Sequence, residues 1–228
     1  WSDVLEIVPA RGNDATLTVT GREVNCPPEK NLVMKAFRLF QENTGIGNVD
    51  IYLHKIIPDG AGLGGGSADA AFTLIGLNKM FECNLNNEQL AAMAAKIGAD
   101  CPFFIYNTPM LATGIGTEFA PVSVNLKGYS IAVVKPQPSV PTAQAYAGVT
   151  PAMPQHDLAS SLTLTVDRWN GIIKNDFEKS VFPAYPLIAQ IKQQLADMGA
   201  VYTAMSGSGS AVFGIFNSCD NLAESIKS

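Results

Sequence analysis

Five glycines lie close together in the segment from Ile57 to Ala71, which reads IPDGAGLGGGSADAA. Glycine lets a backbone approach a ligand closely and permits positive φ. Small residues and then apolar residues at helical spacing follow, so we expect a helix to begin where the glycines end. The N–H groups of such a loop and of the first helical turn, with the helix dipole behind them, favour an anion. The residues Pro58–Ala68, here called the first glycine loop, are therefore predicted to bind phosphate.

A flexible glycine linker is the alternative for this segment. It fits poorly, because the segment lies between an apolar strand and an apolar helix. The two commonest phosphate-binding patterns do not match either. A P-loop ends in Gly-Lys-Ser or Gly-Lys-Thr, and no Lys follows Gly66. A dinucleotide-binding fold needs its glycines just after the first strand of a βαβ unit.

Asp100 is the second candidate for chemistry, in the string Gly98–Phe104 (GADCPFF) between a predicted helix end and a predicted apolar strand. An Asp in such a place is often a turn former whose carboxylate accepts bonds from nearby backbone N–H groups. Phosphoryl transfer, in contrast, needs a group that orients the acceptor hydroxyl and accepts its proton late in the reaction. A carboxylate suits that role, because the proton becomes acidic only as the bond to phosphorus forms.

Composition narrows the class of protein. The chain has 228 residues, of which 47% are hydrophobic and 15% charged, so we expect a globular protein with one large domain or two packed ones. The formal net charge of −5, without a Lys/Arg cluster, argues against a nucleic-acid partner. Because no apolar run approaches the ~18 residues of a membrane span, no membrane partner is expected either. Neither a disulfide framework nor a zinc site is predicted from two His and four scattered cysteines, Cys26, Cys83, Cys101 and Cys219.

Strands and helices must position these residues. Alternating residues predict strands at 4–8 and 16–20, paired as a hairpin. A strand at 49–57 runs into the first glycine loop and carries Lys55, which could meet a nucleotide there, although a solvated strand-end Lys is commoner. Further strands are expected at 111–116 and 131–136. Helical spacing predicts helices from 28 to about 45, from 67 to about 81, and from 87 to 97 with Gly98 as its cap.

The C-terminal half contains three more informative segments. Tyr146 lies one helical turn after Thr142 on the same face, where a Tyr is usually a packing residue. Residues 150–167 read as a loop, and Asn175–Glu178 opens a helix. A second glycine loop, Ser206–Ser210, reads alone as a hairpin turn between two strands. The core-facing stripe of the longer helix that ends at Gly199 is predicted to be Tyr185, Leu187, Ile188, Ile191 and Leu195.

Pro58–Ala71 resembles the nucleotide loop of the GHMP kinases, a family that includes galactokinase, homoserine kinase and mevalonate kinase. The Asp100 string, the Thr142–Tyr146 segment and the second glycine loop match the family in the same order. Together they are most similar to the branch that phosphorylates cytidine diphosphate methylerythritol in the non-mevalonate isoprenoid pathway. The Asn175–Glu178 motif also matches, with a role that is as easily structural.

The resemblance implies an α+β fold of two halves. Residues 1–125 would be a ribosomal protein S5 domain 2-like half and 126–228 a ferredoxin-like half. It further implies a bacterial cytoplasmic enzyme that uses ATP and Mg²⁺ to phosphorylate a hydroxyl of cytidine diphosphate methylerythritol. A mevalonate- or homoserine-type kinase and a non-catalytic nucleotide-binding relative are the alternatives.

The resemblance also implies roles for individual residues. Asp100 would be the general base, Tyr146 the platform for the cytosine ring with Thr142 nearby, and the backbone of Ser206, Gly207 and Ser208 would hold substrate phosphate. The metal ligands stay open among Asp59, Asp69 and Asp100. The expected nucleotide contacts are Lys55, Pro58, Asp59, Gly60, Ala61, Gly62, Leu63, Gly64, Gly65, Gly66, Ser67 and Ala68.

The two ends of the chain depart from the family pattern. In the family, a Lys on an N-terminal strand lies close to the aspartate, and a Gly-Tyr-His stretch that helps to hold substrate follows it. This chain begins at Trp1 and stops at Ser228 within a helical pattern. We therefore expect both ends of a longer protein to be missing.

Overall fold

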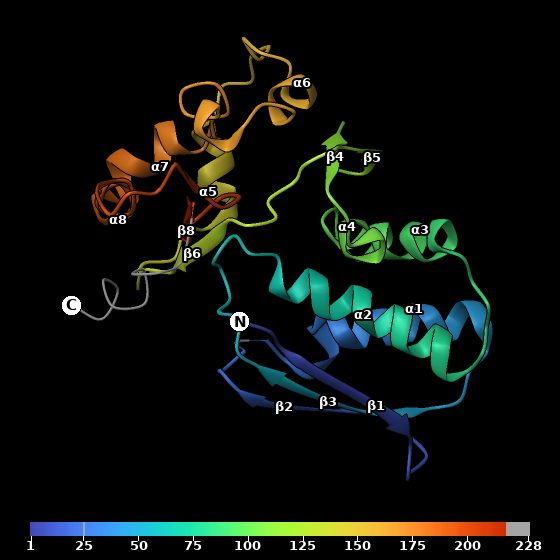
Figure 1. The fold of residues 1–228 in the computed structure, drawn as a ribbon. Coiled ribbons are helices and arrows are strands. Elements are labelled where there is room, and N and C mark those ends of the chain that lie inside the picture. Colours follow the sequence, from blue (N-terminus) through green and yellow to red (C-terminus); the bar gives the residue numbers. More distant parts are fainter. Residues whose placement is uncertain (25, 218–228) are drawn as a thin grey trace. The chain divides into compact units, whose positions relative to one another are not determined.

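The computed structural model describes residues 1–24 and 26–217 (Figure 1). It divides into two compact units. The first unit comprises Trp1–Asp59 and Gly64–Pro121, and the second comprises Gly60–Leu63 and the chain from Val122 onward. Part of the first glycine loop thus belongs with the C-terminal half of the chain. None of the helices in the described ranges is long and apolar enough to cross a membrane.

The first unit packs helices over one face of a three-stranded sheet (Figure 1). Helices α1 and α2 lie directly over the sheet, and α3 and α4 lie beyond them. A separate two-stranded hairpin is formed by β4 and β5. The elements are β1 (Val4–Pro9), β2 (Thr16–Gly21), the short 3₁₀ helix η1 (Pro28–Lys30), α1 (Leu32–Thr44), β3 (Val49–Lys55), α2 (Gly65–Met80), α3 (Asn87–Ile97), α4 (Cys101–Tyr106), β4 (Met110–Thr113) and β5 (Glu118–Pro121).

The predicted hairpin of the first two strands is wrong, because β3 lies between them in the order β1-β3-β2. β1 pairs with β3 antiparallel, and β2 pairs with it parallel. The apolar alternation identifies which face of each strand is buried, but it does not identify the neighbouring strand. Asp50, buried in β3, accepts hydrogen bonds from Thr16 Oγ1 at 2.6 Å and Arg11 N at 3.2 Å. These bonds tie the connection between β1 and β2 to the central strand.

The helices of the first unit begin and end close to the predicted residues. α1 starts after Asn31, whose side chain accepts a hydrogen bond from Val33 N at 2.9 Å, and ends at Gly45 in the left-handed region with φ 72°. The largest fully buried side chains of the core between the helices and the sheet are Phe37, Phe40, Ile51, Leu53, Leu74 and Leu77.

The expected strand after Asp100 is instead the helix α4. Pro102 lies in its first turn, where proline favours a helix start and no N–H is needed. Cys101, Pro102 and Ile105 are buried, so this short apolar run covers the core from one helical face. A run of six apolar or aromatic residues does not by itself distinguish a strand from a helix.

The second unit contains the antiparallel sheet β6-β8-β7 with helices packed against it. The predicted hairpin of the last two strands is confirmed, since β7 and β8 pair antiparallel around the second glycine loop. The elements are β6 (Ser130–Val134), α5 (Thr142–Ala147), α6 (Leu158–Leu162), the 3₁₀ helix η2 (Val166–Arg168), α7 (Glu178–Ala184), α8 (Pro186–Asp197), β7 (Tyr202–Met205) and β8 (Val212–Phe216).

Two further sequence predictions need correction. The segment 150–167, expected to be a loop, contains α6, which begins after Asp157 because that carboxylate accepts a bond from Ser160 N at 2.7 Å. The strand expected at 111–116 ends at Thr113, since Gly114 turns into the left-handed region with φ 64°. Among the cysteines, Cys219 lies outside the described residues; the free thiols are those of Cys26, Cys83 and Cys101.

The predicted stripe of α8 is only partly buried. Ile188 and Leu195 are buried at 0% and 3% exposure, whereas Leu187 is 44% exposed. Leu187 follows Pro186 in the first turn and is not among the buried residues of the helix, which are Ile188 and Leu195. The stripe is therefore narrower than the sequence suggested.

Adjacent positions on α8 should consequently differ in their contribution to stability. We expect Ile188→Ala to lower the free energy of unfolding by about 2–5 kcal/mol, because it leaves a cavity in the core. Leu187→Ala should cost less than about 1 kcal/mol, since that side chain is already largely in solvent. Urea unfolding of both variants measures this, and similar losses would contradict the burial described here.

Candidate active site

Three glycines of the first glycine loop adopt left-handed backbone conformations. Gly60, Gly62 and Gly64 have φ values of 62°, 71° and 68°. Residues other than glycine rarely adopt such backbone angles. The sequence therefore encodes a loop that reverses direction repeatedly before the helix starts.

The loop ends at the N-terminus of α2, with Gly64 as its N-cap. The first backbone bond of the helix runs from Ala68 N to Gly64 O at 2.9 Å. The N–H groups of Gly65–Ser67 precede this bond, so they point out of the helix end without an intrahelical acceptor. This arrangement of donors is suited to phosphate oxygens.

Two glycines of this loop also lie in close contact with neighbouring side chains. A Cβ on Gly64 would lie 2.8 Å from the Phe104 ring, and one on Gly65 would lie 2.8 Å from the Ile57 side chain. Gly66 has more room, with its nearest atom on Leu32 at 3.6 Å. Some of the glycines thus serve packing as well as the approach of a ligand.

The Gly60–Leu63 segment packs on the second glycine loop within the second unit. Ser206 Oγ donates to Gly62 O at 2.7 Å, and Ala211 N donates to Ala61 O at 2.9 Å. A Cβ on Gly62 would lie only 2.1 Å from Ser206 O. Two glycine-rich segments that are 144 residues apart in sequence therefore form one packed element.

Asp100 directly precedes α4, is exposed, and makes no capping hydrogen bond to this helix, whose residues are all described. The structure thus gives no support to a capping role for its carboxylate. The next residue, Cys101, has a buried thiol that is hydrogen-bonded to Ser67 in the first turn of α2. Burial raises the pKa of this thiol, which keeps it neutral. With Phe104 against Gly64, this contact sets the start of α4 beside the N-terminus of α2.

Lys55 is 3% exposed and holds two carboxylates, so the solvated strand-end interpretation is wrong. Its Nζ lies 2.5 Å from Asp3 Oδ2 and 2.7 Å from Asp69 Oδ2. Asp3 Oδ1 also accepts hydrogen bonds from the N–H groups of Ile56 and Ile57, at 2.6 and 2.8 Å. These three charged residues, here called the ion cluster, fix the backbone that leads into the first glycine loop. The contact of Lys55 with a nucleotide stays a prediction.

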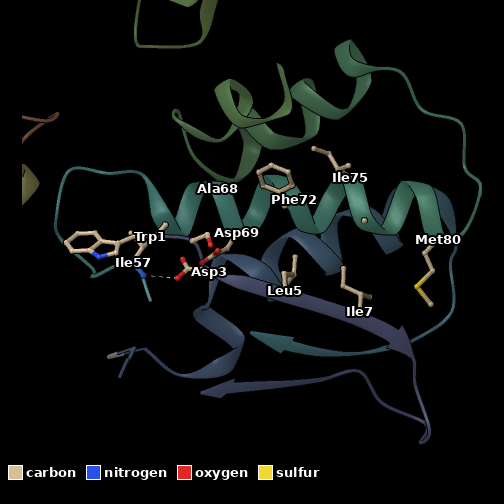
Figure 2. Close-up of a pocket in the computed structure, with 12 residues that line it drawn as sticks. Trp1, Asp3, Leu5, Ile7, Ile57, Ala68, Asp69, Phe72, Ile75 and Met80 are labelled. Carbon is tan, nitrogen blue, oxygen red and sulfur yellow. Dashed lines mark hydrogen bonds between the residues drawn. The ribbon is translucent and has the colours of Figure 1, made fainter. Parts of the chain in front are cut away.

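Figure 2 shows Asp3 and Asp69 side by side in a groove between β1 and α2, with Trp1 on one side of them and Leu5 and Phe72 on the other. The groove has a volume of about 630 Å³. Its apolar lining includes Trp1, Leu5, Ile7, Phe72, Ile75 and Met80. Asp3 and Asp69 are therefore the charged side chains of a groove lined mainly by apolar ones.

Two carboxylates share one ammonium in the ion cluster, which leaves one negative charge in excess in a buried place. Burial raises the pKa of Asp69 to about 6, although the Lys55 ammonium opposes this shift. Burial acts on Asp3 in the same direction, but bonds from Lys55, Ile56 and Ile57 outweigh it and lower the pKa of Asp3. Burial would lower the pKa of Lys55, and the two carboxylates reverse this to a raised pKa. Asp69 is thus the member that takes up a proton first as the pH falls.

Thr142 and Tyr146 are both exposed on the short helix α5, whereas Ala145 provides its buried contact. Tyr146 is 65% exposed, so it is not a core residue. Its centroid lies 4.9 Å from that of Phe177, with the ring planes at 75°. This edge contact occupies at most one face of the Tyr146 ring, so at least one face can still stack on another ring.

The structure groups the predicted site residues by unit. In the first unit, Asp100 and Lys55 lie around the N-terminus of α2. In the second, Gly60–Leu63 lies on Ser206–Ser208. Sequence reasoning missed the roles of Asp3 and Asp69, because Asp3 is 52 residues from Lys55 and a helical Asp carries no signal of its partner. In the described ranges, no group of three or more His, Cys, Asp or Glu could hold a metal ion.

Substitution of two loop glycines should separate packing from ligand approach. Gly62→Ala should lower the free energy of unfolding by more than about 1 kcal/mol, because of its positive φ and the contact with Ser206 O. The matched control Gly66→Ala lies in a helical turn with space for a methyl group, and it should be neutral or stabilising by up to about 1 kcal/mol. Urea unfolding compares the two, and equal effects would contradict the packing of Gly62.

The raised pKa of Asp69 gives its ionisation a stability cost. Since the folded state binds this proton more tightly than the unfolded state, the cost is absent below pH 4 and grows until about pH 6. The wild-type free energy of unfolding, relative to Asp69→Asn, should therefore fall by about 1–2 kcal/mol between pH 4 and 6. Urea unfolding at a series of pH values measures the difference, and parallel pH profiles would argue against this shift.

Comparisons with known proteins agree with this geometry. The model of the GHMP kinases N terminal domain matches residues 31–108, and the model of the GHMP kinases C terminal matches residues 151–227. A 4-diphosphocytidyl-2-C-methyl-D-erythritol kinase of Bacteroides fragilis is 51% identical over 87% of this chain and 72% of its own length. The kinase of the same name from Parabacteroides distasonis is 49% identical over 97% of this chain and 81% of its own.

Solved structures give the same result. A crystal structure of 4-(cytidine 5'-diphospho)-2C-methyl-D-erythritol kinase has a TM-score of 0.77 and 30% identity, covering 99% of this chain and 81% of that one. A homoserine kinase from Cytophaga hutchinsonii has a TM-score of 0.71 at 22% identity, covering 98% and 79%, and shows likeness of fold. The expected α+β fold of the GHMP kinases is confirmed. This chain therefore belongs to the GHMP kinases, the ATP-dependent small-molecule kinases, and within them to the 4-diphosphocytidyl-2-C-methyl-D-erythritol kinases.

Proposed function

We propose that the protein transfers the γ-phosphate of ATP to a hydroxyl of 4-diphosphocytidyl-2-C-methyl-D-erythritol, in the non-mevalonate isoprenoid pathway. The identity of 51% and 49% to two relatives with this name supports the acceptor. One observation carries the site: the segment of Asp100 packs, through Cys101 and Phe104, on the helix end where the first glycine loop presents its N–H groups.

Phosphoryl transfer depends mainly on positioning and on stabilising the charge of the phosphate. In this proposal the backbone of Pro58–Ala68 holds the phosphates of ATP at the N-terminus of α2. Lys55 lies beneath that backbone, with its Nζ 3.5 Å from where a Gly65 Cβ would stand. Its charge therefore acts through the loop. Asp100 orients the acceptor hydroxyl and accepts its proton.

Mg²⁺ accompanies ATP in this proposal. This ion usually keeps several waters and needs only one or two protein carboxylates besides the phosphates. The residues fit that demand, since Asp59 is an exposed carboxylate within the first glycine loop, Asp100 is an exposed one just before α4, and Asp69 lies on α2. When bound, the ion would neutralise charge on the phosphates. Asp59 is the residue we expect to hold it, because an oxygen of Asp69 is taken by Lys55 and Asp100 is assigned to the acceptor hydroxyl.

The second unit is proposed to hold the acceptor. Tyr146 supplies an exposed aromatic face for the cytosine ring, with Thr142 one turn earlier on α5. The backbone N–H groups of Gly207 and Ser208 are proposed to contact the diphosphate, whereas the Ser206 N–H already donates to Ala211 O at 2.8 Å. We place the enzyme in the bacterial cytoplasm, where ATP is available and thiols stay reduced.

Removal of the Asp100 carboxylate should separate turnover from nucleotide binding. We expect Asp100→Asn to lower kcat by about 100-fold or more, which is the usual contribution of general-base catalysis. ATP affinity should stay within about twofold of the wild-type value, because backbone groups hold the phosphates. Asp14→Asn, in an exposed turn of the same unit, is the control and should leave both quantities unchanged. Near-normal turnover of Asp100→Asn would overturn the base assignment.

The acceptor is tested by a phosphoryl-transfer assay with ATP and Mg²⁺. We expect turnover with the cytidine diphosphate methylerythritol and none with mevalonate, homoserine or galactose. Tyr146→Ala should raise the acceptor KM about tenfold through loss of ring stacking, while Tyr146→Phe should restore it. If another acceptor were phosphorylated and its turnover were unaffected by Tyr146→Ala, the protein would be a different small-molecule kinase of the family. ATP binding without any turnover would favour a non-catalytic nucleotide-binding protein.

A further inference from the structure

We propose that the turn Asn175–Glu178 is the positioning element for both acceptor contacts of the second unit. In this assignment, Asn175 and Glu178 hold the backbone of the second glycine loop, and Phe177 holds the ring of Tyr146. The inference rests on the proposed function, since it gives one turn the task of orienting the groups that bind the acceptor.

The turn first fixes its own shape. Asn175 Oδ1 accepts a hydrogen bond from Phe177 N at 3.0 Å, and Glu178 N donates to Asn175 O at 3.1 Å. An Asn side chain that closes its own turn uses its carbonyl oxygen for this purpose. The amide nitrogen of Asn175 is thereby left to make bonds outside the turn.

Asn175 and Glu178 both form hydrogen bonds with the backbone at the start of the second glycine loop. Asn175 Nδ2 donates to Met205 O at 2.8 Å and to Gly207 O at 2.7 Å. Glu178 Oε1 accepts from Met205 N at 2.8 Å, while its Oε2 pairs with Lys192 of α8 at 2.5 Å. Both polar groups of the Met205 backbone are therefore held by side chains of one turn.

These bonds determine where the N–H groups of the loop point. The carbonyl of Gly207 is turned toward Asn175, so the following peptide plane, which carries the Ser208 N–H, is fixed. The plane after Met205 carries the Ser206 N–H, which donates to Ala211 O at 2.8 Å. Ser206 Oγ donates to Gly62 O at 2.7 Å. The turn thus also steadies the contact between the two glycine loops.

Phe177 provides the link to the aromatic contact. Its ring meets that of Tyr146 edge to face, with centroids 4.9 Å apart. Tyr146 lies on α5, which has only six residues and cannot fix an exposed side chain alone. Tyr185 Oη adds a second tie, since it donates to Gln144 Oε1 of α5 at 2.9 Å. Phe177 is then the neighbour that sets the angle of the Tyr146 ring.

A merely structural role for Asn175 can be distinguished with Asn170. Asn170 Nδ2 donates to Val201 O at 2.6 Å, just before β7, whereas Asn175 holds the other end of this strand. Asn170→Ala therefore removes a similar side chain-to-backbone bond far from the second glycine loop. Both substitutions should lower the free energy of unfolding, but only the one at Asn175 should also weaken binding of the acceptor.

Calorimetric titration with cytidine diphosphate tests this assignment on the intact chain. We expect Asn175→Ala to weaken binding about tenfold through loss of two hydrogen bonds, and Asn170→Ala to leave it unchanged. Asn175→Asp, which keeps the acceptor for Phe177 N, should weaken binding as much and serves if the Ala variant does not fold. The proposal would be overturned if Asn175→Ala left cytidine diphosphate binding unchanged, or if Asn170→Ala weakened it as much.

A double-mutant cycle tests the aromatic arm. Phe177→Leu should weaken cytidine diphosphate binding about fivefold, and it should have no further effect in a Tyr146→Ala background, because it acts through that ring. Additive effects would show that Phe177 does not act through Tyr146 and would overturn this arm.

The outcome also separates this inference from the proposed function. A wild-type protein that binds cytidine diphosphate but does not phosphorylate the methylerythritol acceptor would contradict the proposed reaction, and the binding variants would still decide the role of the turn. A wild-type protein that does not bind cytidine diphosphate overturns the inference as well, because there would be no acceptor contact to position.

Discussion

The candidate site depends on the close approach of two backbones at Gly62. The carbonyl of Ser206 occupies the space that any side chain there would need, and the Ser206 hydroxyl returns a hydrogen bond to Gly62 O. A contact of this kind has no flexible side chain through which to adjust, so displacement of one loop displaces the other. The choice of glycine at this position is therefore explained by packing, whether or not the loop also binds phosphate as proposed.

The ion cluster constrains the other end of the first glycine loop. Lys55 on β3 and Asp69 on α2 lie on either side of the loop in sequence, and Asp3 bonds the backbone of Ile56 and Ile57 where the strand ends. Charges buried in this way contribute little net stability, but removal of one partner leaves the others uncompensated. The ion cluster thus specifies the geometry of the junction between β3 and the first glycine loop, and loss of one of its members should lower the free energy of unfolding.

Local patterns predicted much of this molecule because they express local physics. The glycine loops, the helix end at Gly45 and the cap of α3 at Gly98 follow from backbone and capping preferences. Strand order did not follow, since the insertion of β3 between β1 and β2 is decided by burial across the sheet. The partners of Lys55 were missed for the same reason, as one of them is 52 residues away.

The Asn175–Glu178 turn shows how a motif that looks like a helix start can carry a larger task. From sequence alone, a capping Asn followed by acids explains the segment completely. In the structure, the amide nitrogen and the carboxylate bond to Met205 and Gly207 instead, while only the Asn175 carbonyl oxygen serves the turn. Residues that bind through the backbone need other side chains to orient that backbone. For a site made of peptide N–H groups, specificity therefore lies largely in side chains that never touch the ligand.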